Sequence, residues 1–187
     1  MVTKREAPLE YDLARLFTDQ PAWFAQEAVP HLLAWTGRPK GTLKFALSDA
    51  SGRERTLVVR WAAQELAEQF PGLDDLVGRL VDARSLQTEQ VPQYGAYGLA
   101  GVVTSCILKR RIVAVRPWAP PDLLFDATEG AVRGIEVAGR SHRGFAGLRE
   151  LAEEKGRRLR DAPDVAESWI SLWCLTPPVT LLLKVKP

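Results

Sequence analysis

The chain has 187 residues, of which 46% are hydrophobic and 26% charged, and its formal net charge is +2. These values are typical of a folded globular protein about the size of one domain, so we expect a single domain over residues 1–187 and exclude a long disordered region. The near balance of 25 basic and 23 acidic residues excludes a strong overall attraction to nucleic acid. Any basic surface must therefore come from local clustering.

The sequence predicts neither secretion nor membrane insertion. Residues 1–10 are charged and lack the apolar segment of a signal peptide. No stretch contains the ~18 apolar residues that a membrane helix needs. The two cysteines, Cys106 and Cys174, each lie within an apolar run, which predicts buried and unpaired thiols. We therefore expect a cytoplasmic protein with no membrane partner.

The first half of the chain reads as helices around one hairpin. Apolar residues recur with helical spacing before residue 37, and two later segments alternate apolar and polar residues with the period of a strand. Pro30 is expected to split or kink the second helix. The expected elements are two short helices within residues 9–36, a hairpin of strands 42–48 and 54–61, helices over 62–70 and 73–83, and a polar loop over 84–95.

The second half reads as an α/β unit, so we expect a mixed α/β fold with a central mixed sheet flanked by helices. Residues 1–95 would be a helical and hairpin N-terminal part, and residues 96–187 the α/β core. The apolar segment 168–175 predicts a strand that is buried on both faces. The expected elements are a buried helix over 96–110, strands 111–116, 122–126 and 132–138, a helix over 144–160, and strands 168–175 and 179–186.

Acidic residues are expected to face each other across the hairpin of strands 122–126 and 132–138. A turn near residue 129 places Asp122 opposite Glu136, with Asp126 on the same side of the sheet. Facing residues of an antiparallel pair lie about 4.5–5.5 Å apart. Two carboxylates at that distance repel each other unless a cation compensates. Mg²⁺ is commonly held by one or two carboxylates together with water and substrate phosphates.

The segment Pro121-Asp122, followed after thirteen residues by Glu136-Val137-Ala138, resembles the PD-(D/E)xK pattern of the restriction-endonuclease-like nucleases. The resemblance implies a metal-dependent nuclease in which Asp122 and Glu136 hold Mg²⁺. The ion would activate a water molecule and neutralise charge on a phosphodiester. The resemblance also implies a restriction-endonuclease-like core with the order strand–strand–strand–helix–strand, which is the order expected over residues 111–175.

The lysine of the family pattern is replaced here by Ala138. Some members of the family carry that lysine elsewhere, often on the following helix, and Lys155 or Arg140 would take its catalytic role here. Arg143 and His142 precede that helix. They suit contacts with a nucleic-acid backbone, because basic side chains and helix N-termini bind phosphate.

Two classes of function fit these observations. The first is a metal-dependent nuclease-like protein, a Mg²⁺-dependent phosphodiesterase acting on DNA or RNA, or an inactive relative that binds nucleic acid without cutting it. The second is a non-enzymatic subunit or regulator that contacts a protein partner in a larger bacterial assembly. The balanced charge and the missing lysine favour the second, for which Trp118 is a candidate contact. Structural roles for Asp122 at a strand start, and for Glu136 paired with an arginine, also remain open.

Overall fold

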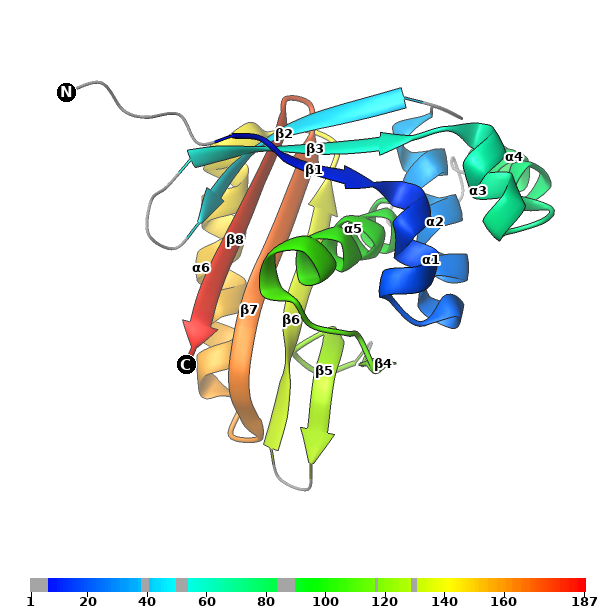
Figure 1. The fold of residues 1–187 in the computed structure, drawn as a ribbon. Coiled ribbons are helices and arrows are strands. Elements are labelled where there is room, and N and C mark those ends of the chain that lie inside the picture. Colours follow the sequence, from blue (N-terminus) through cyan, green and yellow to red (C-terminus); the bar gives the residue numbers. More distant parts are fainter. Residues whose placement is uncertain (1–6, 38–40, 50–53, 84–89, 117, 129–130) are drawn as a thin grey trace.

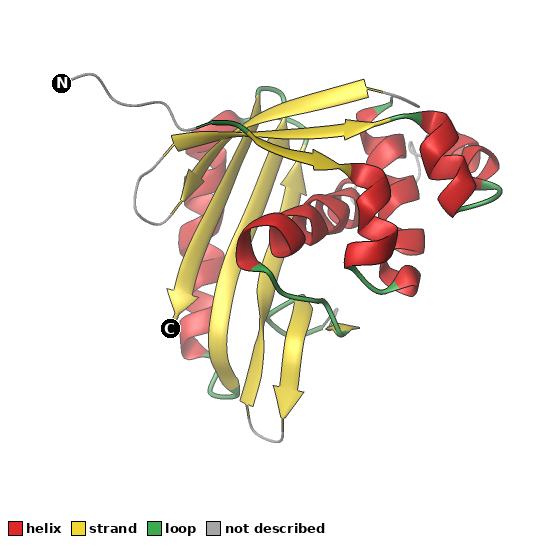
Figure 2. Ribbon diagram, viewed as in Figure 1, coloured by secondary structure: helices red, strands yellow, loops and turns green. Residues whose placement is uncertain are grey.

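An eight-stranded mixed sheet forms the centre of the structure, and helices cover both of its faces (Figures 1 and 2). The structure is a computed structural model that describes residues 7–37, 41–49, 54–83, 90–116, 118–128 and 131–187. The strands are β1 (Leu9–Asp12), β2 (Gly41–Asp49), β3 (Glu54–Trp61), β4 (Ala114–Val115), β5 (Leu123–Thr128), β6 (Ala131–Arg140), β7 (Val165–Leu175) and β8 (Pro178–Lys186). The helices are α1 (Leu16–Asp19), α2 (Ala22–Thr36), α3 (Ala63–Gln69), α4 (Leu73–Asp82), α5 (Gln90–Val103) and α6 (Gly144–Asp161), with a 3₁₀ turn η1 (Leu13–Arg15) and a π-helical turn η3 (Thr104–Leu108).

The order of strands across the sheet is β1-β3-β2-β8-β7-β6-β5-β4. The pairs β1/β3, β2/β8 and β6/β7 are parallel, and the other neighbouring pairs are antiparallel. Because β2 pairs with the C-terminal strand β8, residues 1–95 and 96–187 contribute to one sheet. This confirms the predicted mixed α/β class with a central mixed sheet. The boundary predicted at residue 95 falls inside α5.

The sheet divides the apolar core into two layers. Figure 1 shows α2 and α5 on one face of the sheet and α6 on the other. The larger cluster lies with α2 and α5 and includes Leu32, Leu99 and Trp173. The smaller cluster lies under α6 and includes Leu148 and Leu172. Successive residues of β7 thus enter different layers, as strand geometry requires, and this confirms that the segment is buried on both faces.

The hairpin of β5 and β6 has the expected register where the acidic pair lies. Leu123 pairs with Ile135 in the antiparallel ladder. The same register extended by one residue places Asp122, which immediately precedes β5, opposite Glu136. The antiparallel hairpin is therefore confirmed as far as Leu123 and Ile135, whereas Asp122, expected as the first residue of the strand, precedes β5.

A β-bulge corrects the expectation for Asp126. The register shifts between Leu124 and Asp126, so Asp126 pairs with Arg133. Its carboxylate forms an ion pair with the Arg133 guanidinium at 2.9 Å on the protein surface. A shift of one residue moves a side chain to the other face of a sheet, so Asp126 does not join Asp122 and Glu136.

Helix α6 connects β6 to β7, and these two strands are parallel. The chain turns into the helix through two left-handed residues, Arg143 (φ 92°) and Gly144 (φ 55°). Leu148 and Leu159 are buried at helical spacing, as the sequence predicted. The succession β4, β5, β6, α6, β7 is the order expected over residues 111–175, although β4 contains only two residues.

The N-terminal region departs from the expected pair of helices. Leu9 stands at helical spacing from Leu13 and Leu16, but Leu9–Asp12 forms β1 and pairs with β3. The extended backbone buries Tyr11, whose hydroxyl donates to Asp19 Oδ2 at 2.9 Å. Backbone bonds along the edge of β3 therefore outweigh a weak helical preference. Helix α2 continues through Pro30 without a break.

Two further expectations are corrected in part. Helix α5 begins at Gln90, inside the segment 84–95 that was expected to be a loop; residues 84–89 lie outside the described residues. Cys174 is buried and Cys106 is half-buried, and both are unpaired. Burial raises the pKa of the Cys106 thiol to about 11. None of the described helices is both long and apolar enough to span a membrane.

The packing of β7 predicts a large penalty for Trp173→Ala. Trp173 is fully buried, meets the ring of Phe45 edge-on at 5.0 Å and donates from Nε1 to Ser171 Oγ at 2.7 Å. We expect its removal to lower the free energy of unfolding by roughly 3–5 kcal/mol through cavity formation. Trp118→Ala is the matched control, because Trp118 is 94% exposed. Equal melting temperatures for the two variants would contradict this architecture.

Candidate active site

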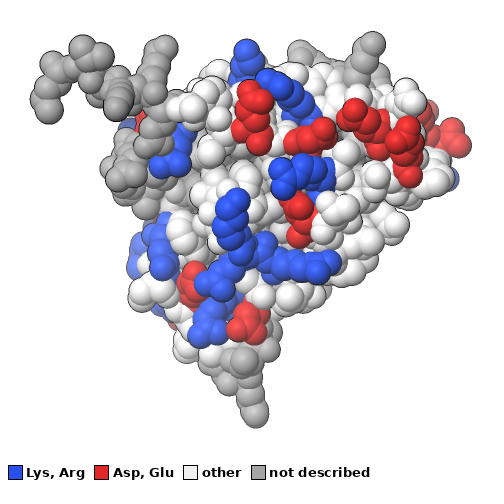
Figure 3. Space-filling model, in the orientation of Figure 1, with Lys and Arg blue, Asp and Glu red and all other residues white. Residues whose placement is uncertain are grey.

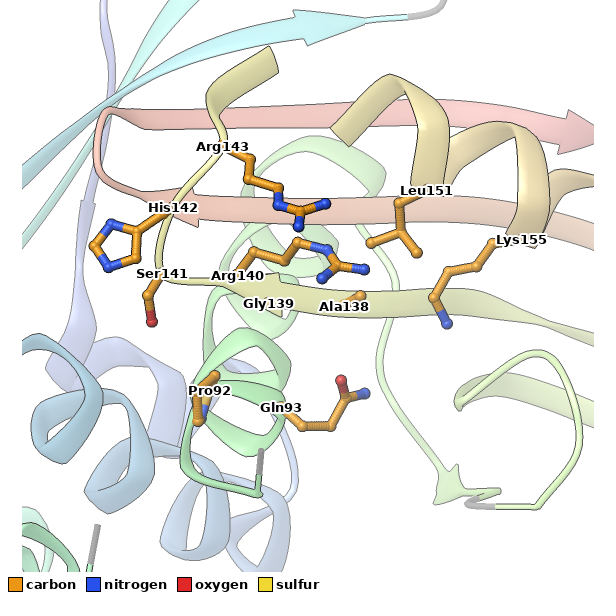
Figure 4. Close-up of a pocket in the computed structure, with 10 residues that line it drawn as sticks. All are labelled: Pro92, Gln93, Ala138, Gly139, Arg140, Ser141, His142, Arg143, Leu151 and Lys155. Carbon is orange, nitrogen blue, oxygen red and sulfur yellow. The ribbon is translucent and has the colours of Figure 1, made fainter. Parts of the chain in front are cut away.

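A pocket opens where β5 stops pairing with β6. The two strands are paired as far as Ile135, and the continuation of β6 lies between α5 and α6. The pocket there has a volume of about 480 Å³. Figure 4 labels its lining residues, which come from α5, the end of β6, the turn that follows it and α6. At Gly139 a Cβ would collide with the Pro92 carbonyl oxygen, so glycine permits α5 to approach β6 and form one wall.

Glu136 and Lys155 form an ion pair beside this pocket. Glu136 lies on the face of β6 that α6 covers, and it is 2% exposed. Lys155 follows the buried Leu151 by one turn of α6, so its side chain returns toward the sheet. The Lys155 Nζ lies 2.6 Å from Glu136 Oε1. The second carboxylate oxygen, Glu136 Oε2, is buried and has no hydrogen-bond partner among the described residues.

Asp122 completes an acidic pair with Glu136. Its Oδ2 accepts a hydrogen bond from the backbone N–H of Val137 at 2.8 Å, on the edge of β6 beyond the β5 ladder. Burial and, second, the negative charge of Glu136 raise the pKa of Asp122 to about 6; Lys155, the Val137 N–H and Arg158 oppose this rise. The carboxylate therefore stays partly protonated well above its usual range unless positive charge is added.

Helix α5 contributes two residues that sequence reasoning missed. Gln93 donates from Nε2 to the Val137 carbonyl oxygen at 3.2 Å and also lines the pocket. Tyr97, one turn further, is buried, and both burial and the charge of Asp122 raise the pKa of its hydroxyl. Residues four apart lie on the same face of a helix, so the spacing of Gln93 and Tyr97 could have indicated a shared site. The sequence, however, predicts a loop for the segment that contains Gln93.

Basic residues occupy the other end of the pocket. Arg140, His142 and Arg143 line it and are exposed, and Figure 4 shows both arginine side chains extending into it. Neither arginine forms an ion pair with a described residue. Two guanidinium groups that converge without a counter-charge favour an anion between them, such as a phosphate. Ser141 accepts a bond from Trp35 Nε1 at 3.4 Å, which holds the turn.

The residues fit a hard divalent cation with an open coordination sphere. The described residues contain no group of three or more His, Cys, Asp or Glu side chains that would enclose a metal. They do provide two neighbouring carboxylates, and Glu136 Oε2 is a buried acceptor without a donor. Mg²⁺ commonly uses one or two carboxylates and takes its other ligands from water and substrate phosphate, so Asp122 and Glu136 match its needs.

Four of the six residues predicted as a site, Arg140, His142, Arg143 and Lys155, line this pocket, and Asp122 and Glu136 interact with Lys155. Lys155 pairs with Glu136 and acts electrostatically on Asp122. Arg140 at the end of β6, with His142 and Arg143 in the turn after it, lines the far end. Comparison of the chain with protein-family models, curated proteins and solved structures finds no match. The chemistry of the pocket must therefore be argued from its own residues.

The raised pKa of Asp122 predicts a pH-dependent gain from Asp122→Asn in metal-free buffer. The carboxyl ionises near its ordinary pKa of 3.8 in the unfolded chain and near 6 in the folded protein. Wild-type stability therefore falls as pH rises between these values and stays reduced above them. The variant cannot ionise and escapes this loss, so its advantage should grow by about 2 kcal/mol from pH 4 to pH 8.

Thermal unfolding at several pH values measures this advantage. Asp126→Asn is the control, because Asp126 is an exposed carboxylate of the same strand. An Asp122→Asn variant whose advantage is the same at both pH values would show that Asp122 is not held in a site that disfavours its charge.

Proposed function

We propose that the protein is a metal-dependent phosphodiesterase that acts on nucleic acid. The observation that carries this proposal is the buried ion pair of Glu136 and Lys155, with Asp122 beside it. The pocket that Lys155 lines also contains two arginines, and neither forms an ion pair with a described residue. A buried ion pair is a weak source of stability, because desolvation offsets much of its Coulomb energy. Its position at the wall of an open pocket favours a role in chemistry.

Asp122 and Glu136 would hold Mg²⁺, which when bound supplies a polarised water and positive charge toward a phosphate oxygen. The protein's own contribution is to fix the two carboxylates. The Val137 N–H orients Asp122, and Lys155 orients Glu136 through Oε1. Glu136 Oε2 is left free for a ligand. The positive charge would also offset the burial and the repulsion from Glu136 that together raise the pKa of Asp122.

Lys155 supplies the ammonium group that the PD-(D/E)xK pattern carries at the position of Ala138. Its Nζ contacts Glu136 from the helix that follows β6, as in family members whose lysine has moved to that helix. A proton donor or cation at this place would bind a non-bridging oxygen of the scissile phosphate. Arg140, the other candidate for this role, lies four residues beyond Glu136 on β6 and is better placed for a neighbouring phosphate.

The distribution of charge supports a polyanionic substrate. Figure 3 shows acidic side chains over α3 and α4, and basic side chains over the region where the chain leaves η3 toward β4. The exposed run Lys109-Arg110-Arg111 lies in that region. Arg143 and His142 add basic groups at the N-terminal end of α6. These clusters supply the local positive surface that the net charge of +2 does not, and phosphate contacts of this kind position a backbone without reading its sequence.

One observation favours the second function, a contact with a protein partner. Trp118 is 94% exposed and Val113 is 52% exposed, on the segment that contains β4. Large exposed aromatic side chains are frequent centres of protein interfaces. An interaction subunit would lose its partner on Trp118→Ala and keep it on Glu136→Gln.

Cleavage of fluorescent DNA and RNA oligonucleotides, with Mg²⁺ or Mn²⁺ at millimolar concentration, tests the enzymatic proposal. We expect metal-dependent cleavage that falls by about 100-fold or more in Asp122→Asn, Glu136→Gln and Lys155→Gln. Asp126→Asn, a carboxylate-to-amide change outside the pocket, is the control and should retain full activity. Melting temperatures separate lost chemistry from lost folding, because Lys155→Gln leaves Glu136 buried without its counter-charge.

The remaining outcomes separate the alternatives. Salt-sensitive binding without cleavage, unaffected by Glu136→Gln, identifies an inactive relative that binds nucleic acid. A wild-type protein that neither cuts nor binds nucleic acid at low salt with either metal contradicts the proposal and leaves the protein-interaction function.

A further inference from the structure

A second cavity lies on the opposite flank of α6 from the candidate active site. Its volume is about 530 Å³, and it lies between α6 and β8. Leu181 and Leu183 provide an apolar floor, and α6 contributes Ala152 and Gly156. Because these two helix residues are small and one turn apart, they leave the space between helix and sheet unfilled. The lining of the cavity runs along α6 from Arg149 to Arg160 and along β8 from Leu181 to Val185, so we call it the trough. Figure 1 shows α6 running alongside β7 and β8.

The trough follows an edge of β8 that pairs with no described strand. β2 pairs with β8 only from Val179 to Leu182. Along Leu183–Lys186, β8 has β7 on one side, and no described strand pairs with its other side. The register with β7 shifts at Val185, which lies between the paired Lys184 and Lys186. Outward-facing backbone N–H and C=O groups on the other side of this segment can bond to an added strand. Leu183 and Val185 on this segment also line the trough.

Positive charge flanks the trough. Arg149 and Arg160 line it from α6 and are exposed, and neither forms an ion pair with a described residue. Lys184 lies at the strand side, with its ammonium group 5.6 Å from the centre of the Trp169 ring. Glu153 is the acidic residue of the lining. Eleven residues of helix separate the two arginines, a rise of about 16 Å.

We propose that this trough binds an extended acidic peptide, which adds as a strand along Leu183–Lys186 of β8. The backbone of Leu183–Lys186 would form hydrogen bonds with the peptide backbone. The trough would discriminate among the side chains of the peptide. In a strand every second side chain points to the same face, and four residues span about 13 Å. Side chains at positions 1, 3 and 5 would thus point toward α6. An acidic residue at positions 1 and 5 would reach Arg149 and Arg160, and an apolar residue at position 3 would enter the trough.

The edge of β8 that pairs with no described strand favours a peptide over a small amphipathic anion. Such an anion would use the apolar floor and the arginines but would leave the backbone of β8 unpaired. A strand uses all three features. The inference is independent of the proposed phosphodiesterase, because the residues that line this trough and those that line the active-site pocket are different.

Fluorescence anisotropy with labelled nine-residue peptides tests the proposal on the full chain. The probe is GSETLTESG, which places glutamate at the first and fifth positions of the bound segment and leucine at the third. GSTELETSG has the same composition but directs both glutamates to the other face. GSKTLTKSG reverses the charge. A fourth peptide, GSETLTESG methylated on alternate backbone nitrogens, cannot complete the ladder.

We expect the probe to bind about tenfold more tightly than each of the three control peptides at low ionic strength. Arg149→Glu together with Arg160→Glu should weaken probe binding by at least about tenfold. Gly156→Leu should do the same by filling the trough. The Gly156 variant should fold, because a Cβ there meets only the end of the Arg160 side chain, at 3.2 Å. Arg157→Glu, an exposed arginine of α6 outside the lining, is the matched control.

Three results would overturn the proposal: no binding of the probe up to about 1 mM, equal binding of the backbone-methylated peptide, or binding that survives Gly156→Leu. Oligonucleotide cleavage by the same preparation reports on the other site, so the failure of one proposal is distinguishable from the failure of the other.

Discussion

The contact between Lys155 and Glu136 links the strand, the helix and the pocket. The carboxylate is almost fully buried under α6, and the ammonium group that neutralises it belongs to α6 itself. Removing one partner of a buried pair typically costs about 3–5 kcal/mol, because it leaves the other charge uncompensated. The pair therefore ties α6, which packs on β7 and β8, to β6, and it holds Lys155 at the wall of the pocket.

The geometry of β6 explains why a pocket exists at this point. The first half of the strand is paired on both sides, with β5 and β7, whereas the second half is paired only with β7. Asp122 and Gln93 bond to Val137 where the β5 ladder ends. Side chains thus replace backbone partners at this edge, which leaves the end of β6 open to α5, α6 and solvent. The acidic pair sits at the start of this open edge, and the arginines lie toward its end.

Local pattern was sufficient to predict the hairpin, helix α6 and the central strand β7. The register that faces Asp122 with Glu136 followed from strand alternation and turn position, and helix periodicity made Lys155 available. The fold of Leu9–Asp12 and the start of α5 could not be read this way, because a free edge of β3 and contacts with β6 decide them. The bulge before Asp126 also leaves no local signature. The bulge moves Asp126 away from the face that it was predicted to share with Asp122 and Glu136. The sequence predicts a helix only from residue 96, so Gln93 was not recognised as a residue of the site.

A crystal grown with Mn²⁺ gives the most direct test of the account, because the anomalous signal of the ion locates it without assumption. We expect a peak between the carboxylates of Asp122 and Glu136, with Glu136 Oε2 among the ligands and Lys155 still at Oε1. We also expect the peak to disappear in Glu136→Gln. Full occupancy of Mn²⁺ elsewhere, with no density between these two residues, would contradict a metal-dependent site at this position.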